Sequence, residues 1–241
     1  MRFTVLMPTY NRDYLIGQAI ESVLDQTFKD FELLIIDDGS SDTTAKIVSD
    51  YKKIDDRIVY HKIPHRGLVP ALNKGNELAR GEIIVKADSD DLCLPNRLEK
   101  IANFFNTWKN TEFLYHGMYK SWESETGTIR REYIPASRLD RDRILKDQYI
   151  PGCFAYTKEF IQKHPYRQLY CSEDWMLILD AYFSKARIGV IDEGLYEYCL
   201  REDSNSLIHE GTGNYEQDEL TMREILYKEY GIPNFKYASR K

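Results

Sequence analysis

The sequence predicts an α/β fold in which helices flank a central sheet that is mostly parallel, with a mixed part. Continuous apolar runs alternate with segments whose apolar residues recur at helical spacing. The runs are apolar along their whole length, which is typical of parallel strands covered on both faces. A chain of 241 residues can also form one large domain with a substantial core.

The first half of the chain repeats the order strand, loop, helix. Turn residues such as Pro8, Gly39 and Gly81 separate these elements. The expected strands are residues 3–7, 33–36, 58–60 and 83–85. The expected helices are residues 15–24, a segment around 45–48, residues 68–79, and a helix opened by Pro95 with Leu98, Ile101, Ala102, Phe105 and Trp108 on its apolar face.

The regular alternation stops between residues 110 and 120. We therefore expect one domain in two halves, residues 1–110 and 111–241, with a mixed sheet in the second. The elements expected there are a strand at 113–119, a hairpin within 120–133, a charged helix at 138–146, a strand at 152–156, a helix beginning at 173, strands at 188–191 and 195–200, and a final helix at 216–230.

Composition excludes several classes of protein. The 33 basic and 39 acidic side chains give a net charge of −6 and are interspersed, which argues against a nucleic-acid-binding surface. The four cysteines form no CxxC pair, so we expect reduced thiols in a cytoplasmic protein. No apolar run reaches the ~18 residues of a membrane span or resembles a signal peptide. The basic tail 236–241 is the feature that favours peripheral contact with a membrane.

Three carboxylates directly follow the apolar run 83–85, in the sequence KADSDD at residues 86–91. Repulsion among such close carboxylates raises the pKa of at least one of them unless a cation is present. Oxygen ligands of this kind favour Mg²⁺ or Mn²⁺ over zinc. The alternative is an exposed loop in which an aspartate caps the helix that begins near Pro95. Taken alone, the cluster does not separate these two interpretations.

Two other expected strands also end in unusual residues, PTYNR at 8–12 and DDGS at 37–40. In an open parallel sheet, ligands bind at the carboxyl ends of the strands. If the three strands are neighbours, their loops supply a ring for stacking, carboxylates for ribose hydroxyls and a metal for phosphates. This combination favours a nucleotide site, although either loop seen separately is typical of an ordinary turn.

The glycine-rich phosphate-binding motifs GxGxxG and GxxxxGK[ST] are absent from the sequence. Other groups must therefore neutralise the phosphates of a nucleotide. The acid cluster with Mg²⁺ or Mn²⁺ would do so, with Arg66 and Lys74 as candidate helpers. Either base is equally consistent with a solvated surface residue.

Together these segments closely resemble the inverting family-2 glycosyltransferases, which have the GT-A fold, a Rossmann-like arrangement. The similarity in order and spacing covers roughly residues 3–185. The matching segments are the two nucleotide loops at 8–12 and 37–40, LNKG at 72–75, GEII at 81–84, the DxD motif at 88–90, and the ED motif at 173–174 that carries the catalytic base.

The resemblance implies a role for each residue of the donor site. Pro8 and Tyr10 would frame the nucleobase, and Asp38, with Asp37 beside it, would bind uracil or ribose. Asp88 would contact ribose and Asp90 would ligate Mn²⁺ or Mg²⁺. In this scheme residues 1–110 bind a nucleoside-diphosphate sugar, most simply a UDP-sugar.

The resemblance also implies that residues 111–241 bind the acceptor and supply the base. Asp174 would take the proton of an acceptor hydroxyl while that oxygen attacks the anomeric carbon in line, which inverts its configuration. Glu173 would be its neighbour at the helix start. The alternative for this pair is helix capping, because acids are favoured at helix N-termini. Asp91 would either support its loop or cap the next helix.

The acceptor side is less specific in sequence. Trp175, beside the expected base, is the candidate for contact with an acceptor. The polar stretch 202–215 is a candidate lid, from which Arg201 and His209 could reach the diphosphate. The acceptor would be a glycan or a lipid-linked saccharide, as in the synthesis of bacterial surface polysaccharides.

Two other classes of protein use similar loops. A metal-dependent nucleotidyltransferase would need a glycine-rich loop with a basic residue after the first strand, and residues 8–12 contain no glycine. A non-catalytic nucleotide-sugar or carbohydrate-binding protein would lack the base, which the presence of Asp174 disfavours.

Overall fold

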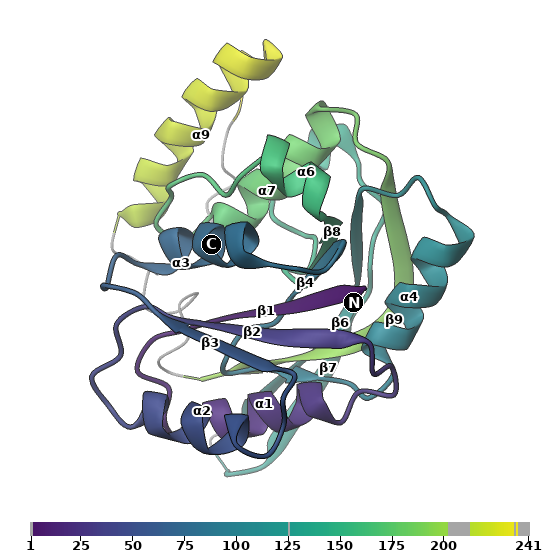
Figure 1. Ribbon diagram of the computed structural model, residues 1–241. Helices are drawn as coiled ribbons and strands as arrows, with labels where there is room; N and C mark the ends of the chain where they lie inside the picture. Colours follow the sequence, from purple (N-terminus) through teal and green to yellow (C-terminus); the bar gives the residue numbers. More distant parts are fainter. Residues whose placement is uncertain (1, 125, 202–212, 234, 236–241) are drawn as a thin grey trace.

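The computed structural model describes residues 2–124, 126–201, 213–233 and 235, which form a mixed sheet with helices on both faces (Figure 1). The strand order is β3-β2-β1-β4-β8-β6-β9-β5, and β7 pairs with β6 outside this path. The strands are β1 (Phe3–Thr9), β2 (Phe31–Asp37), β3 (Ile58–Lys62), β4 (Ile83–Lys86), β5 (Leu92–Cys93), β6 (Phe113–Glu123), β7 (Ile129–Ile134), β8 (Phe154–Thr157) and β9 (Ile188–Leu200). The predicted α/β class is confirmed.

The first four long strands are parallel neighbours, as expected from their apolar composition. β1 lies between β2 and β4, and β3 pairs with the outer edge of β2. Alternate side chains of β1 enter opposite cores, with Val5 and Met7 on one face and Leu6 on the other. The three loops that follow β1, β2 and β4 therefore meet at one edge of the sheet.

The sheet becomes mixed where the second half of the chain joins it. β8 pairs antiparallel with β4 on one side and with β6 on the other. β9 then runs parallel to β6, with irregular register near Gly117. Because β8 is the direct neighbour of β4, the second half of the chain reaches the acid cluster that follows β4.

Two layers of helices cover the sheet and fill separate cores (Figure 1). One core contains side chains from α1 (Ile16–Leu24), α2 (Thr44–Lys52) and α4 (Arg97–Thr107). The other contains side chains from α3 (Leu68–Leu78), α5 (Arg141–Ile144), α6 (Lys158–Lys163), α7 (Glu173–Phe183) and α9 (Asn214–Tyr230). The long apolar helix α7 lies in this second core.

Three expectations about individual elements are wrong. The charged helix expected at 138–146 is only the single turn α5, which begins after Asp140 because its side chain accepts a hydrogen bond from the Arg143 backbone. The strands expected at 188–191 and 195–200 are one strand, β9, because β6 pairs with both parts. Trp108 is 62% exposed rather than core-facing, since the chain leaves the helical conformation there.

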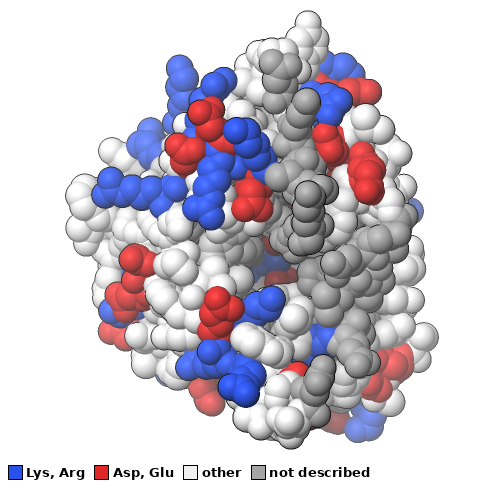
Figure 2. Space-filling model, turned by 180° about the vertical axis from the view of Figure 1, so that it is seen from behind, with Lys and Arg blue, Asp and Glu red and all other residues white. Residues whose placement is uncertain are grey.

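Acidic and basic side chains are intermixed on the face shown in Figure 2, where a hollow near the centre has charged atoms at its floor. In the described part of the chain, no helix has the length and apolar character needed to cross a bilayer. Most of the expected lid, residues 202–212 with His209, and the basic tail 236–241 lie outside the described residues.

Candidate active site

A cleft of about 1610 Å³ opens where β1, β2 and β4 end. Its walls include the loops after these strands, residues 65–69, residues 148–153 and the first turn of α7. The predicted site residues that line it are Pro8, Tyr10, Arg66, Asp38, Asp88, Asp90 and Asp174. Asp37 is fully buried behind this surface. The structure thus brings both expected ends of the site, the nucleotide loops and the base, to one cavity.

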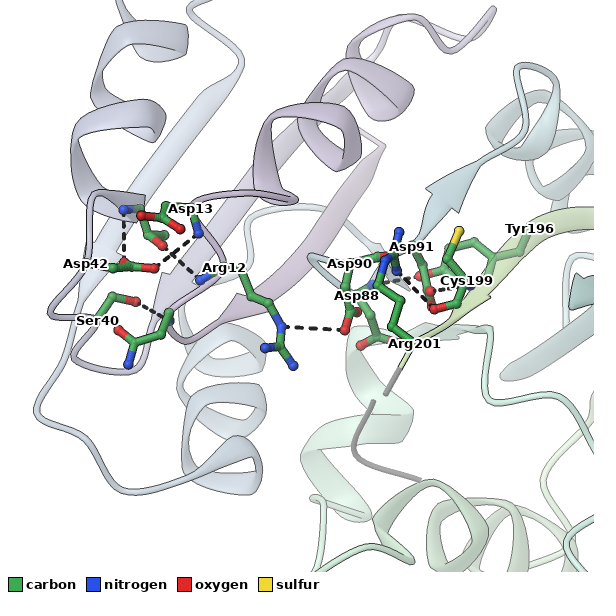
Figure 3. A network of polar contacts seen from close by, with 12 residues as sticks. Arg12, Asp13, Ser40, Asp42, Asp88, Asp90, Asp91, Tyr196, Cys199 and Arg201 are labelled. Carbon is green, nitrogen blue, oxygen red and sulfur yellow. Dashed lines mark hydrogen bonds and ion pairs between the residues drawn. The ribbon is translucent and has the colours of Figure 1, made fainter. Parts of the chain in front are cut away.

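The loops after β1 and β2 hold each other in place (Figure 3). The backbone amide of Asn11 donates to the hydroxyl of Ser40 at 2.9 Å, and the Ser41 amide donates to the Asn11 side chain at 2.8 Å. The Arg12 amide donates to the Thr44 hydroxyl at 3.0 Å. Because each loop both donates hydrogen bonds to the other and accepts them from it, the two loops together form one wall of the cleft.

Asp38 is a buried carboxylate whose oxygens accept several hydrogen bonds. The backbone amides of Arg66 and Gly67 donate to its two oxygens at 2.8 and 2.7 Å. The imidazole Nδ1 of His65 lies 2.8 Å from the same carboxylate. Asp37 is similarly committed, because the Ser40 amide and the Tyr60 hydroxyl both donate to it. Asp38 therefore fixes the segment 65–67 against the loop after β2.

Tyr10 presents a ring at the mouth of the cleft. It is 42% exposed and stacks on His65, with ring centroids 4.1 Å apart and an angle of 15° between the planes. His65 was not predicted as a site residue, because an isolated histidine in a loop carries no signal in the sequence. The stacked pair offers a flat surface of the kind on which a nucleobase can pack.

The three carboxylates after β4 differ in their surroundings (Figure 3). Asp91 is buried and accepts a hydrogen bond from the Cys199 backbone at 2.9 Å, so it supports the loop against β9. The side chains of Asp88 and Asp90 are 31% and 23% exposed and line the cleft. Burial raises the pKa of Asp91 well above its ordinary value, and the charges of Asp90 and Asp88 raise it further.

Two arginines face this loop from other elements. Nε of Arg12 lies 3.5 Å from the carboxylate of Asp90, and Arg201 donates to the Asp90 backbone carbonyl at 2.6 Å. Burial raises the pKa of Asp90 and the charge of Asp88 raises it further, while Arg12 and Arg201 act in the opposite direction. The positive charges of these arginines thus only partly offset the effects of burial and of Asp88 on Asp90.

The donor set is compatible with a metal ion that a ligand helps to coordinate. In the described ranges, no three His, Cys, Asp or Glu side chains are grouped to hold a metal. Mg²⁺ in phosphate-transfer sites commonly uses one or two carboxylates and takes its other ligands from water and substrate phosphates. Asp90, which faces the cleft and has a raised pKa, fits such a site.

The first turn of α7 brings Glu173 and Asp174 into the cleft. One oxygen of Asp174, Oδ2, lies 3.2 Å from Nζ of Lys86. The other, Oδ1, is buried and has no hydrogen-bond partner among the described residues. A buried carboxylate oxygen without a protein partner can bind a water, an ion or a ligand. The N-cap of α7 is Ser172, so Asp174 lies within the first turn, where the helix dipole also favours an acid.

The two acids of α7 have different pKa values. Burial raises the pKa of Asp174 to about 6, against the opposing effect of Lys86. Burial and the adjacent charge of Asp174 raise the pKa of Glu173 to about 8. Because the two carboxylates are adjacent and buried, ionisation of one disfavours ionisation of the other, and the charge of Lys86 favours the ionised form of Asp174.

The start of α7 is held by residues that the sequence did not indicate. Asp218 of α9 is buried and accepts hydrogen bonds from the backbone amides of Tyr170, Cys171 and Ser172 at 2.9, 2.9 and 3.0 Å. These three residues immediately precede Glu173. A carboxylate near the N-terminus of α7 is also favoured by the helix dipole. Asp218 thus fixes the segment from which Asp174 projects.

The expectation that Trp175 contacts the acceptor is wrong. Its side chain is 1% exposed and packs beside Phe235, and its indole nitrogen donates to the Ile144 carbonyl at 2.8 Å. Successive residues of a helix point in different directions, so Trp175 enters the core while Asp174 faces the cleft. Trp175 anchors α7.

Comparison with known proteins identifies similar chains. Residues 4–164 match the family described as "Glycosyl transferase family 2". The chain is 30% identical over 219 residues to the Bacillus subtilis minor teichoic acid biosynthesis protein GgaB, covering 88% of this chain but 24% of that protein. It is 28% identical over 193 residues to the GalNAc(5)-diNAcBac-PP-undecaprenol beta-1,3-glucosyltransferase of Campylobacter jejuni, covering 77% and 61% of the two chains.

Among solved structures, residues 1–349 of TarS from S. aureus, in complex with UDP-GlcNAc, superpose with a TM-score of 0.75 at 22% sequence identity. The match covers 94% of this chain and 67% of that one. Similarity at this level of identity concerns the arrangement of the elements.

Proposed function

The chain belongs to glycosyl transferase family 2 and has the GT-A fold, and on this basis we propose that it transfers a sugar from a nucleoside-diphosphate sugar to an acceptor hydroxyl with inversion at the anomeric carbon. The observation that carries the proposal is the position of Asp174. Asp174 lines the same cleft as the acid cluster after β4, and its side chain is 15% exposed. One cavity therefore contains both a candidate base and groups that can hold a diphosphate.

We assign the donor nucleotide to the loops after β1 and β2. The base would stack on Tyr10 beside Pro8, and Asp38 would bind uracil or ribose. A carboxylate has about four acceptor positions, and the backbone amides of Arg66 and Gly67 use two of those of Asp38. Acceptor capacity remains for a donor N–H or O–H of the ligand, as uracil N3 or a ribose hydroxyl provides. Asp37 contributes indirectly by fixing the turn at Ser40.

Asp88 would contact the ribose, and Asp90 would hold Mn²⁺ or Mg²⁺ together with the donor phosphates. When bound, the metal ion neutralises the negative charge that develops on the leaving diphosphate. Arg66 and Arg12 line the same cleft and contribute positive charge at its wall. The protein's own role here is to fix the diphosphate so that the anomeric carbon faces Asp174.

Asp174 would act as the general base. Its carboxylate would accept the proton of the acceptor hydroxyl while that oxygen attacks the anomeric carbon opposite the leaving group. The pKa of about 6 makes Asp174 more basic than an ordinary aspartate and leaves it mostly ionised at neutral pH. General-base catalysis of this kind contributes roughly 10²- to 10⁴-fold to a rate.

We propose a glycan or lipid-linked acceptor in the synthesis of a surface polysaccharide. The two relatives are named for teichoic acid synthesis and for glucosyl transfer to an undecaprenol-linked saccharide. A lipid-linked acceptor would require the protein to work at a membrane surface.

A donor screen tests the proposal. The protein is incubated with UDP-, GDP- and dTDP-sugars, with Mn²⁺, Mg²⁺ or EDTA, and released nucleoside diphosphate is measured. We expect UDP release from one UDP-sugar, dependent on metal, together with β-to-α or α-to-β inversion in any trapped product. UDP binding without release from any donor would instead indicate a binding protein. Pyrophosphate formation from UTP and a sugar phosphate would indicate a nucleotidyltransferase.

Calorimetric titration tests the metal assignment. We expect Mn²⁺ to strengthen UDP binding to the natural protein and to have no such effect on Asp90→Asn. The matched control is Asp56→Asn, an exposed aspartate outside the cleft. Equal affinity for UDP with and without metal in the natural protein would contradict the assignment of Asp90.

A further inference from the structure

Lys86 is a buried amine at the end of a strand in the centre of the sheet. It is the last residue of β4, and its side chain is 4% exposed. A charged group in such a place is unfavourable unless it is paired and hydrogen-bonded. The carboxylates that pair with this ammonium therefore determine its role.

The ammonium of Lys86 is paired with two carboxylates from distant parts of the chain. Nζ donates to Oδ2 of Asp88 at 2.8 Å and to Oδ2 of Asp174 at 3.2 Å. Asp88 lies in the loop that follows β4, while Asp174 lies in the first turn of α7. Lys86 is thus the single described side chain that bonds to both the donor loop and the proposed base.

The contact with Lys86 involves one of the two carboxylate oxygens of Asp174 and leaves the other without it. Oδ2 is held by Lys86, and Oδ1 has no partner in the parts of the chain that the structure describes. The glycine at 152 leaves the room that Oδ2 occupies, because a Cβ placed there would lie 2.6 Å from that oxygen. Oδ2 is therefore held by Lys86 and lies close to Gly152, while Oδ1 makes no hydrogen bond within the described residues.

We propose that Lys86 is a positioning residue that orients Asp174 through Oδ2 and couples its position to the donor loop through Asp88. This inference rests on the proposed function and adds a residue to it. Lys86 acts through Asp174 and Asp88 and need not touch the sugar. A change in the donor loop would then move the base through one shared ammonium.

Several other groups act on Asp174 from the elements around it. Those that share its electrostatic environment are Lys86, Asp88, Glu173, Cys153, Tyr156 and Tyr166. Within this set Lys86 alone is cationic, while Asp88 raises the pKa of Asp174. Removing the ammonium leaves burial and Asp88 unopposed, so the pKa of Asp174 would rise. The base would then be protonated near neutral pH and unable to accept a proton.

The test compares Lys86→Met, Lys86→Gln and Lys86→Arg in the donor and acceptor assay, across pH 5 to 9. We expect both neutral variants to lose about 100-fold in kcat at pH 7, with a much smaller rise in the KM for the donor, because Asp88 also loses its partner. Their acid limb in the pH profile would move upward by at least one pH unit, so part of the rate returns at pH 9. Lys86→Arg would stay within tenfold of the natural enzyme.

Controls separate this role from a merely structural one. Thermal unfolding and UDP titration establish that each variant folds and binds nucleotide. Lys100→Met removes an exposed lysine that pairs with Glu193, and we expect it to leave both kcat and the pH profile unchanged. A buried charge that served only the fold would lower the melting temperature without moving the acid limb.

A folded neutral variant with the natural kcat and acid limb would overturn the inference. If neither neutral variant folds, Lys86→Arg decides: it supports the inference when activity is kept and overturns it when transfer falls more than 100-fold with normal UDP binding. Failure of the proposed function has a different signature, because the natural protein would then release no diphosphate from any donor.

Discussion

The wall formed by the loops after β1 and β2 and the first turn of α7 face the same cleft but are built differently. In the wall, Asp37 and Asp38 accept hydrogen bonds from backbone amides or side chains at both of their oxygens. In α7, Asp174 has one oxygen bound by a lysine and one unpaired. The first region is satisfied within the fold, and the second is incomplete without a ligand.

This difference distinguishes carboxylates that fix the local backbone from a carboxylate that can accept a proton. A carboxylate that accepts hydrogen bonds from the protein at both oxygens fixes the backbone around it and has less capacity to take a proton. A buried oxygen without a partner costs folding free energy and is available for reaction. The wall should therefore govern donor affinity, whereas the first turn of α7 should govern turnover.

The largest effect is expected from removing the base. Asp174→Asn keeps the size of the side chain but eliminates proton acceptance, so kcat should fall by about 10³-fold. UDP affinity should stay within about twofold, because the wall is untouched. Steady-state kinetics and calorimetry measure the two quantities. Asp50→Asn, an exposed aspartate of α2, is the matched control and should change neither. A variant of Asp174 that turns over at the natural rate would remove this residue as base.

A smaller loss of kcat is expected from adding one carbon atom beside the proposed base. Gly152→Ala would place a Cβ 2.6 Å from Oδ2 of Asp174, which Lys86 also holds. The side chain must move, and a displacement of this kind should lower kcat roughly 10- to 100-fold with donor KM unchanged. Gly17→Ala is the matched control, since its nearest contact would be the Tyr51 hydroxyl at 3.4 Å. An effect of Gly152→Ala on donor KM alone would argue that residues 148–153 belong with the wall.

The sequence predicted the wall better than the base because of how each is assembled. The wall loops at 8–12 and 37–40 follow apolar strands, as does the acid cluster at 88–91, and the parallel order of β2, β1 and β4 brings the three strand ends together. The neighbours of Asp174 have no such relation. Asp174 itself was found through a family resemblance, and spacing alone left helix capping as an alternative.

The missed residues share one physical cause. Lys86 is visible in the sequence beside the acid cluster, but its bond to Asp174 joins residues that are 88 positions apart in the chain. Asp218 lies on α9, and the order of polar and apolar residues in that helix does not predict that Asp218 accepts hydrogen bonds from the backbone amides of residues 170–172. Trp175 was misassigned because the direction of a side chain on a mostly apolar helix is not readable from composition. Periodicity reports which elements form, and long-range pairing decides which side chains meet.

A decrease of about tenfold in kcat/KM is expected when the pH falls from 7 to 5. With a pKa of about 6, Asp174 is about nine-tenths ionised at pH 7 and about one-tenth ionised at pH 5. Because the base must be ionised to accept a proton, kcat/KM should fall about tenfold between these values and level off above pH 7. UDP affinity measured over the same range gives the contrast with the wall and should change much less. A profile that is flat from pH 7 to pH 5, with the protein still folded, would contradict the role of Asp174.

The smallest effect is expected from the wall itself. Tyr10 is 42% exposed and stacked on His65 at 4.1 Å, so a nucleobase can pack on its open face. Tyr10→Ala removes a stacking contact of about 1 kcal/mol, which should raise the donor KM about fivefold. Because Tyr10 belongs to the wall, kcat should remain within about twofold, and Tyr10→Phe should restore the donor KM. Tyr14→Ala, an exposed tyrosine that does not line the cleft, is the matched control for loss of a surface ring. A 100-fold loss of kcat in Tyr10→Ala, with KM unchanged, would place the wall in the chemical step and remove the distinction between the two regions.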